Sequence, residues 1–279
     1  MKHALGRSSP GTIVIIVILV VLATLWLYPL VWTLSNSLKT SSQIYTAPWA
    51  LPVPPVWDNF PRAWTQGQLG SALSNSLYTT GLSVVMVLAV SLPAAFGLTN
   101  LRPPRRNALF LLMLAPLFVP SEVILVPLFT MFRALGLLNR LEGLAIFDAV
   151  THVGLATVIL ASFFRIIPKD LLDAARVDGA GRLRVLALIV IPLAAPGIFA
   201  VSLVIAISVW NDFFGAVVLI QRPESFTVPL ALSRFSTAYT TDQGLTFAGL
   251  AVAIIPALLL FLVMQRSFVR GLTAGAIRG

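Results

Sequence analysis

The sequence predicts an all-α membrane protein whose chain crosses the bilayer six times. Of its 279 residues, 58% are hydrophobic and only 10% are charged, whereas about 25% are charged in a typical soluble domain. Such a chain lacks the polar side chains that a water-exposed surface requires. Six apolar runs each reach the ~20 residues that cross ~30 Å of hydrocarbon as a helix. The charged residues lie mainly in the short segments between these runs.

The first apolar run covers residues 12–34. It is longer than the apolar core of a signal peptide, which has 7–15 residues. It ends in Trp26, Tyr28 and Trp32, and such aromatic side chains are typical of the membrane–water interface. The sequence therefore predicts a retained transmembrane helix.

Residues 35–70 form a polar connection with a proline cluster from Ala47 to Pro55, which indicates an extended, semi-rigid segment. Five further spans are predicted at about 74–98, 108–131, 144–167, 196–219 and 245–267. Prolines in or at the ends of these spans predict kinks, because neighbouring helices can satisfy the carbonyls that proline frees. These prolines are Pro93, Pro116, Pro120, Pro127, Pro196 and Pro256.

The stretch from Asp170 to Pro196 is the most densely charged part of the chain. We expect Asp170 to cap a short helix, with Asp173 completing a capping-box-like pair three residues later. Asp178-Gly179 is typical of a helix-ending turn, and a second helical run begins at Arg182. The alanines and glycines of the whole stretch leave little side-chain bulk, so another backbone can approach closely. We therefore interpret the stretch as a docking element outside the bilayer.

The apolar run from Ile189 to Ile220 has 32 residues, or about 48 Å as a helix. That is too long for one straight span. We therefore expect its first part, up to Pro192 or Pro196, to lie near the membrane surface. A break between this part and the following span is predicted.

Lysine and arginine are distributed unevenly between the two sides of the membrane. With six spans both termini share one side, which holds 13 of the 19 Lys and Arg residues, and the other side holds 6. The positive-inside rule places the richer side in the cytoplasm. Both termini and the Asp170–Pro196 stretch are then cytoplasmic, and the proline-rich connection is outside.

The composition also argues against several other functions. The net charge of +9 is spread over short loops rather than gathered in a basic patch with aromatics, so nucleic-acid binding is not expected. There is no cysteine, which excludes disulfides and thiolate metal sites. The chain has no phosphate-binding loop of the G-x-x-x-x-G-K-[ST] type, so any nucleotide must bind a partner.

The charged stretch resembles the signature loop of ABC importer permeases. The matching residues are Asp173-Ala174-Ala175 and Asp178-Gly179-Ala180, followed by Pro192 and Pro196. The family pattern has Glu at the first position, where this chain has Asp173, and usually Phe where it has Leu186. The resemblance implies the type I ABC importer permease fold in the inner membrane of a prokaryote.

Motifs along nearly the whole chain are similar to the second, maltose-type permease of the carbohydrate-uptake branch. They are Asn36-Ser37-Leu38-Lys39, Asp58-Asn59-Phe60, Asn75-Ser76, Pro93 to Gly97, Val126 to Phe129, Trp210 to Phe213 and Gln265 to Ala276. The resemblance implies a non-catalytic subunit with no cofactor of its own. Its expected partners are a homologous second permease, two copies of an ATP-binding subunit that holds ATP and Mg, and a soluble or lipid-anchored solute-binding protein that delivers a sugar.

The chain is accordingly divided into residues 1–71, a permease core at 72–267 with its coupling loop at about 168–195, and a tail at 268–279. The resemblance implies that the coupling loop contacts the ATPase. The expected coupling residues are Asp170, Asp173, Ala174, Ala175, Asp178, Gly179 and Ala180. The tail, with Arg266 and Arg270, is expected to reach the same subunit or simply to hold the C-terminus inside.

The solute path is expected from polar and aromatic residues inside the spans. Trp210, Asn211 and Asp212 combine a ring face with hydrogen-bonding groups, and Asn75 and Tyr78 can join them from the second span. Hydrogen bonding between helices is the alternative role for such residues.

Asp148 and His152 lie on one face of the fourth span. They form either a proton relay or a polar pair at a wetted outer mouth, and two nearby ligands are too few for a metal site.

Two alternatives stay open, one within the same class of transporter and one from another class. An ABC permease for another solute, such as glycerol phosphate or a polyol, would keep the docking loop. A stand-alone secondary transporter would need inverted repeats and its own ion site, and no convincing repeat is evident.

Overall fold

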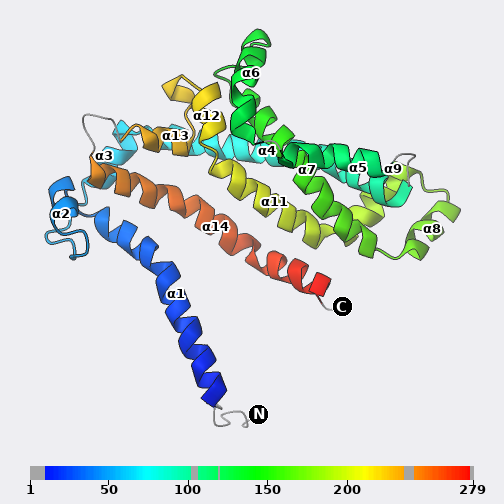
Figure 1. The fold of residues 1–279 in the computed structure, drawn as a ribbon, viewed down its shortest axis with the longest axis horizontal. Coiled ribbons are helices and arrows are strands. Elements are labelled where there is room, and N and C mark those ends of the chain that lie inside the picture. Colours follow the sequence, from blue (N-terminus) through cyan, green and yellow to red (C-terminus); the bar gives the residue numbers. More distant parts are fainter. Residues whose placement is uncertain (1–9, 102–105, 119, 236–241, 277–279) are drawn as a thin grey trace. The chain divides into compact units, whose positions relative to one another are not determined.

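The computed structural model describes residues 10–101, 106–118, 120–235 and 242–276 (Figure 1), and this part of the chain is helical without strands. The α-helices are α1 (Pro10–Asn36), α2 (Ser41–Thr46), α3 (Asn59–Gln66), α4 (Leu69–Phe96), α5 (Arg106–Leu114), α6 (Ser121–Ala134), α7 (Leu141–Ile166), α8 (Lys169–Val177), α9 (Arg182–Val185), α10 (Ile191–Leu193), α11 (Ala195–Trp210), α12 (Phe214–Leu219), α13 (Val228–Ser233) and α14 (Gln243–Ala276). Short π-helices, η1 (Gly97–Leu101) and η3 (Leu186–Val190), and 3₁₀ turns, η2 (Ala115–Phe118) and η4 (Pro223–Ser225), continue or connect them.

Three helices are long and apolar enough to cross a membrane, in the regions of the first, second and fourth predicted spans. They run over Gly11–Asn36, Leu69–Asn100 and Leu141–Ile166. Two bent helix pairs raise the number to five when each pair is counted as one span. The remaining candidate is α14, whose residues Gln243–Leu259 are apolar.

The predicted break before the fifth span is confirmed. The helical segment Arg182–Leu193 meets Ala195–Trp210 at an angle of 80°. The bend lies at Ala194, between Pro192 and Pro196. Pro196 occupies the first turn of α11, where a missing backbone N–H costs no hydrogen bond.

Two predicted spans are not continuous helices. The segment predicted at 108–131 is Arg106–Phe118 and Val123–Ala134, bent by 99°. The segment predicted at 196–219 ends as a helix at Trp210 and resumes at Phe214. With 16 residues, α11 is about 24 Å long, so the break at Asn211–Phe213 lies within the expected membrane depth.

The chain forms two units, Met1–Gly67 with Arg234–Val252, and Gln68–Ser233 with Ala253–Gly279. The boundaries predicted at residues 71 and 267 stay predictions. Each unit is described below by itself.

In the first unit, one amide organises the turn that follows α1. Asn59 Nδ2 donates 2.9 Å hydrogen bonds to the carbonyls of Ser37 and Lys39. The Lys39 side chain is buried, and its ammonium group donates to the carbonyls of Ala47 (3.3 Å) and Pro48 (3.0 Å). Burial lowers the pKa of Lys39. The two motifs at 36–39 and 58–60 therefore form one network.

Aromatic stacking connects the end of α1 to the proline-rich segment. The Trp49 ring lies 5.9 Å from Tyr28 and 5.7 Å from Trp32, measured between ring centroids. Trp32 also makes an edge contact with Phe247 of α14, at 5.1 Å. Two of the three predicted interface aromatics of the first span thus hold the connection against its helix.

The second unit is built around α4, α7 and α11, which pack on one another. Small side chains line the contact, including Ala95, Ala156 and Ala161, all buried. Two serines of α4 reach carbonyls of α7: Ser83 Oγ lies 3.4 Å from the Ala145 oxygen and Ser91 Oγ lies 3.3 Å from that of Val153. Small residues and interhelical hydroxyl bonds are typical of helix packing in membranes.

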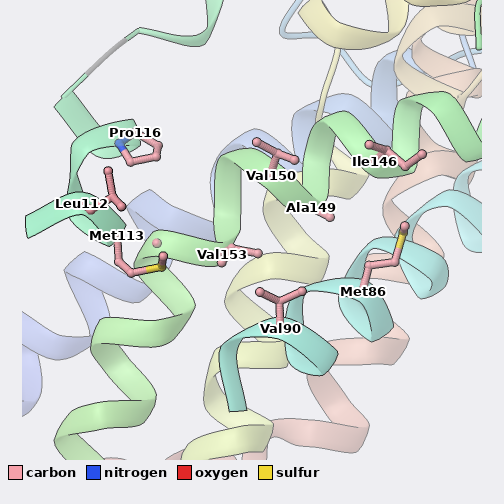
Figure 2. A pocket seen from close by; sticks show the side chains of 10 residues that line it. Met86, Val90, Leu112, Met113, Pro116, Ile146, Ala149, Val150 and Val153 are labelled. Atoms are coloured by element: carbon pink, nitrogen blue, oxygen red, sulfur yellow. The ribbon is translucent and has the colours of Figure 1, made fainter. Parts of the chain in front are cut away.

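The helix α5 also packs on α7, at Gly154. A Cβ at this position would collide with the carbonyl of Met113, so glycine is needed for the close approach. Beside the contact lies a cavity of about 340 Å³ with apolar walls from α4, α5, η2 and α7 (Figure 2). Met86 of α4 and Met113 of α5 are among the residues that line it.

Candidate functional site

The loop between α7 and α11 begins with a helix that no side chain caps. The N-cap position of α8 is Pro168, and Lys169 is the first helical residue. The predicted cap by Asp170 and its pairing with Asp173 are therefore wrong. Pro168 with φ −58° is extended and starts the helix itself, so Asp170 lies in the first turn, where its charge favours the helix dipole. Asp173 instead accepts a 2.8 Å ion-pair bond from Arg176.

The Asp178-Gly179 pair predicted a helix-ending turn, and the turn after α8 is a Schellman motif. The N–H of Ala180 donates to the Ala175 carbonyl at 2.9 Å, and that of Gly179 donates to Arg176 at 3.0 Å. Gly179 has φ +81°, which glycine adopts at low cost. No neighbouring atom lies within 4 Å of where its Cβ would be. The backbone hydrogen bonds of the turn are thus made within the turn itself, and the space outside Gly179 is empty.

One leucine anchors α8 while the opposite face stays exposed. Leu172 is buried in the core around α4, α7 and α11, and Ala175 and Ala180 pack against that core. The other expected coupling residues, Asp170, Asp173, Ala174, Asp178 and Gly179, are exposed. Two apolar side chains beside them are exposed as well, Val177 by 88% and Leu183 by 77%. The sequence analysis did not single out these two residues, although an apolar side chain in a short charged loop can indicate a contact surface.

A second feature is a cavity of about 650 Å³ between α4, α11 and α14 in the second unit. Its walls are mostly apolar. Trp210 and Asn211 from the predicted solute path line it, together with Thr80, Gly81 and Ser202. The Thr80 hydroxyl is buried and has no hydrogen-bond partner among the described residues. Thr80 and Ser202 were not predicted, because single hydroxyl residues in apolar spans usually bond to their own helix.

The structure does not bring all five predicted path residues together. Asn75 donates to the carbonyls of Glu224 (2.9 Å) and Phe226 (3.0 Å), and Tyr78 donates to Glu142 at 3.1 Å. Neither lines the cavity.

Asn211 and Asp212 have local partners in the helix break. Asn211 uses its amide N–H on the Ile207 carbonyl at 2.7 Å, which leaves its oxygen for another partner. Asp212 accepts from the Gly215 N–H at 3.1 Å, at the start of α12. Hydrogen bonding within the protein is therefore the observed role of Asn75, Tyr78 and Asp212.

Asp148 is 1% exposed, so the prediction of a wetted pair with His152 is wrong for this carboxyl. Packing of α7 against α4 and α11 buries it, which an apolar span does not reveal by itself. Within the part of the chain that the structure describes, no group of three or more His, Cys, Asp or Glu side chains could hold a metal ion.

The predicted tail contacts fall at the edge of the described chain. The backbone of α14 extends to Ala276. The side chains of Arg266 and Arg270 lie outside the described residues.

The sequence matches the profile of the family described as "binding-protein-dependent transport system inner membrane component" over residues 88–274. It is 33% identical to the probable ABC transporter permease protein YurM of Bacillus subtilis, over 90% of this chain and 84% of that one. It is 33% identical to the sulfoquinovosyl glycerol transport system permease SmoH of Agrobacterium fabrum, over 91% and 89%. It is 32% identical to the trehalose transport system permease SugB of Mycobacterium tuberculosis, over 91% and 93%.

Among solved structures, the fold is similar to a chain of a bacterial ABC transporter that imports alginate. The TM-score is 0.80 at 24% identity, and the alignment covers 96% of this chain and 100% of that one. A chain of the MetNI methionine transporter in an inward-facing conformation matches at a TM-score of 0.56 and 17% identity, over 72% and 94%.

Proposed function

Because the chain belongs to the family of binding-protein-dependent transport system inner membrane components, we propose that it is one of two permease subunits of an ATP-driven sugar importer. The main support for this proposal is the exposed outer face of the loop that contains α8. The loop presents this face on a Schellman turn, anchored by Leu172 from behind. Its exposed apolar side chains, Val177 and Leu183, suit contact with another protein.

The loop is proposed to dock on an ATP-binding subunit that supplies ATP and Mg. Asp173, Ala174, Asp178 and Gly179, with Val177 and Leu183, form the contact surface, while Ala175 and Ala180 hold the loop to the core. Closure of the two ATP-binding subunits then moves α8 and the helices joined to it. This is rigid-body switching driven by contacts that differ between two states.

The cavity lined by Trp210 and Asn211 is proposed to form half of the solute path. A ring face and hydrogen-bonding groups on otherwise apolar walls suit a sugar, whose own faces are apolar and whose rim is polar. Sugar as the solute is supported by relatives named for trehalose and for melibiose, raffinose and stachyose. A polyol or glycerol phosphate is the alternative solute.

The protein is proposed to lie in the inner membrane with both termini in the cytoplasm, because most lysines and arginines lie on that side. The proline-rich connection then faces outward, where a solute-binding protein docks. The tail after Phe268 is proposed to reach the ATP-binding subunits. If deletion of the tail left ATPase stimulation unchanged, the tail would have no role in contacting the ATP-binding subunits.

Reconstitution tests the proposal directly. The chain is co-expressed with the second permease and the ATP-binding subunit, placed in liposomes, and given the solute-binding protein and labelled oligosaccharides. We expect uptake that requires ATP and the binding protein. Uptake driven by an ion gradient without ATP would instead identify a secondary transporter, and ATP-driven uptake of a polyol alone would identify the alternative solute.

A further inference from the structure

The segment between α1 and α3 carries no charge but exposes large apolar side chains. Residues 40–57 contain no Asp, Glu, Lys or Arg. Five of their side chains are between 66% and 80% exposed, and we call them the exposed apolar group: Tyr45, Trp49, Leu51, Val53 and Trp57. Single exposed apolar residues are common on proteins, whereas a gathering of them without charges marks a surface that contacts a partner or a membrane.

The polar groups of the same segment are bonded among themselves. The side-chain amide of Gln43 donates to the Val53 carbonyl at 3.2 Å. The Val56 N–H donates to the Leu38 carbonyl at 2.8 Å, and the Lys39 ammonium group holds two further carbonyls. Four residues of the segment are prolines, which have no N–H to satisfy. Bonded backbone and exposed apolar side chains together suit surroundings of low polarity, where an unpaired backbone group is costly.

Aromatic stacking holds this segment at the end of a membrane span. The Trp49 ring stacks against Tyr28 and Trp32 in the last turns of α1. The helix over Gly11–Asn36 is long and apolar enough to cross a membrane, and its most apolar stretch is not buried by the described residues. A span surrounded by lipid therefore carries Trp49 with it to the membrane surface.

The aromatic side chains continue onto α3. The Trp57 ring lies 6.4 Å from that of Phe60, measured between centroids. Trp64 follows Phe60 by four residues, on the same face of the helix, and is also exposed. Five of the six tryptophans of the chain lie within residues 26–64. Tryptophan prefers the membrane–water interface, because its ring is apolar and its N–H is a hydrogen-bond donor.

The lack of charge favours lipid over a protein as the partner of this surface. Protein interfaces are enriched in arginine and bounded by a polar rim, and residues 40–57 provide no charged side chain. Without lysine or arginine the segment also has no attraction for anionic headgroups. The matching chemistry is that of a zwitterionic bilayer, whose ester oxygens lie directly above its acyl chains.

We propose that residues 45–64 form an interfacial anchor, with the exposed apolar group immersed between the lipid headgroups and the upper acyl chains. The anchor fixes the depth of the turn after α1. The hydrogen bonds of Asn59 and Lys39 then lie just outside the hydrocarbon. An anchor of this kind works on either side of the membrane and for any solute, so it does not rest on the proposed orientation or on sugar transport.

Spin labels test the anchor directly, because the chain has no cysteine of its own. Leu51→Cys and Val53→Cys place a label within the exposed apolar group, and both side chains are exposed, so the fold should tolerate the change. Gln66→Cys is the matched control. It is exposed on α3 and lies two residues past Trp64, on the opposite side of the helix. The protein, with any subunits that accompany it, is placed in phosphatidylcholine vesicles, and the wild type supplies the background.

Collision rates with oxygen, which concentrates in lipid, and with a water-soluble nickel complex locate each label. We expect oxygen collisions to exceed nickel collisions several-fold at positions 51 and 53 and the reverse at position 66. Nickel collisions at 51 and 53 as frequent as those at 66 would overturn the anchor.

A protein partner gives a different result. Low rates with both reagents at positions 51 and 53 would show that another subunit covers the surface, and would also overturn the anchor. Addition of the solute-binding protein should leave the oxygen rates at both positions unchanged. A fall in these rates would assign the surface to that protein instead of to lipid.

Discussion

Arg62 and Asp242 form a 2.8 Å ion pair between α3 and the segment that leads into α14, 180 residues apart in the chain. The same carboxyl accepts from the Leu245 N–H at 3.1 Å and the Ser41 hydroxyl at 3.2 Å. One aspartate therefore holds three segments of the first unit together. Burial opposes its ionisation, but the Leu245 N–H, the Arg62 guanidinium and the Ser41 hydroxyl together lower the pKa of Asp242.

The first prediction concerns the pH dependence of this contact. A lowered folded-state pKa makes the contribution of Asp242 complete above about pH 4, the pKa of an unfolded aspartate, and lost as pH falls through the folded value. Asp242→Asn should therefore destabilise the chain at neutral pH and not in strong acid. Both side chains are more than a third exposed, so the ion pair itself should contribute less than about 1 kcal/mol. Thermal unfolding in detergent at both pH values measures the difference, and an equal loss in acid would refute it.

The second prediction concerns the contact between α5 and α7. Gly154→Ala should destabilise the protein by about 1–3 kcal/mol, because the new methyl group collides with the Met113 carbonyl. Gly97→Ala is the matched control, since no atom lies within 4 Å of its Cβ position. That change should be neutral or stabilising, by up to about 1 kcal/mol. Denaturation midpoints of the two variants decide the matter, and equal midpoints would show that α5 does not approach α7 this closely.

The third prediction concerns coupling. Gly179→Asp should leave the membrane assembly intact but uncouple ATP hydrolysis from uptake, because the added side chain enters open space on the outer side of the turn. The left-handed backbone costs a non-glycine residue about 1–2 kcal/mol, too little to unfold the loop. Gly181→Asp is the matched control, since it adds the same charge in open space at a position with an ordinary φ of −66°. ATPase activity and uptake are measured side by side, and normal coupled uptake in Gly179→Asp would contradict the docking role.

The fourth prediction concerns the cavity between α4, α11 and α14. Gly81→Leu should reduce uptake several-fold without loss of assembly, because the leucine fills part of the 650 Å³ space that Gly81 lines. Gly97→Leu on the same helical run has open space but does not line the cavity, so it should transport normally. Initial uptake rates at saturating binding protein provide the test. Equal rates would place the solute path elsewhere.

The fifth prediction concerns solute recognition by Asn211. Asn211→Ala should change the preference among oligosaccharides, because the free amide oxygen is the group left to contact a solute. Competition between labelled and unlabelled sugars measures this preference. Reduced transport with unchanged preference would indicate that Asn211 only ends α11.

The sequence alone was sufficient for the helical class, for the three long apolar helices in the regions of the first, second and fourth predicted spans, and for the turn at Asp178-Gly179. These properties are local, since an apolar run of sufficient length and a glycine after a short helix act through neighbouring residues. The motifs of the α8 loop predicted the family for the same reason. The Asp170 cap was wrong because Pro168 begins the helix two residues earlier.

Tertiary packing decided the rest. Nothing near Tyr78 in the sequence indicates its bond to Glu142, 64 residues away, and nothing near Asn75 indicates its bonds to Glu224 and Phe226. The burial of Asp148 likewise depends on helices that meet α7 from other parts of the chain. A side chain's partner is set by which helices pack together, and in an apolar chain the hydropathy pattern shows which segments enter the membrane without showing which of their faces meet.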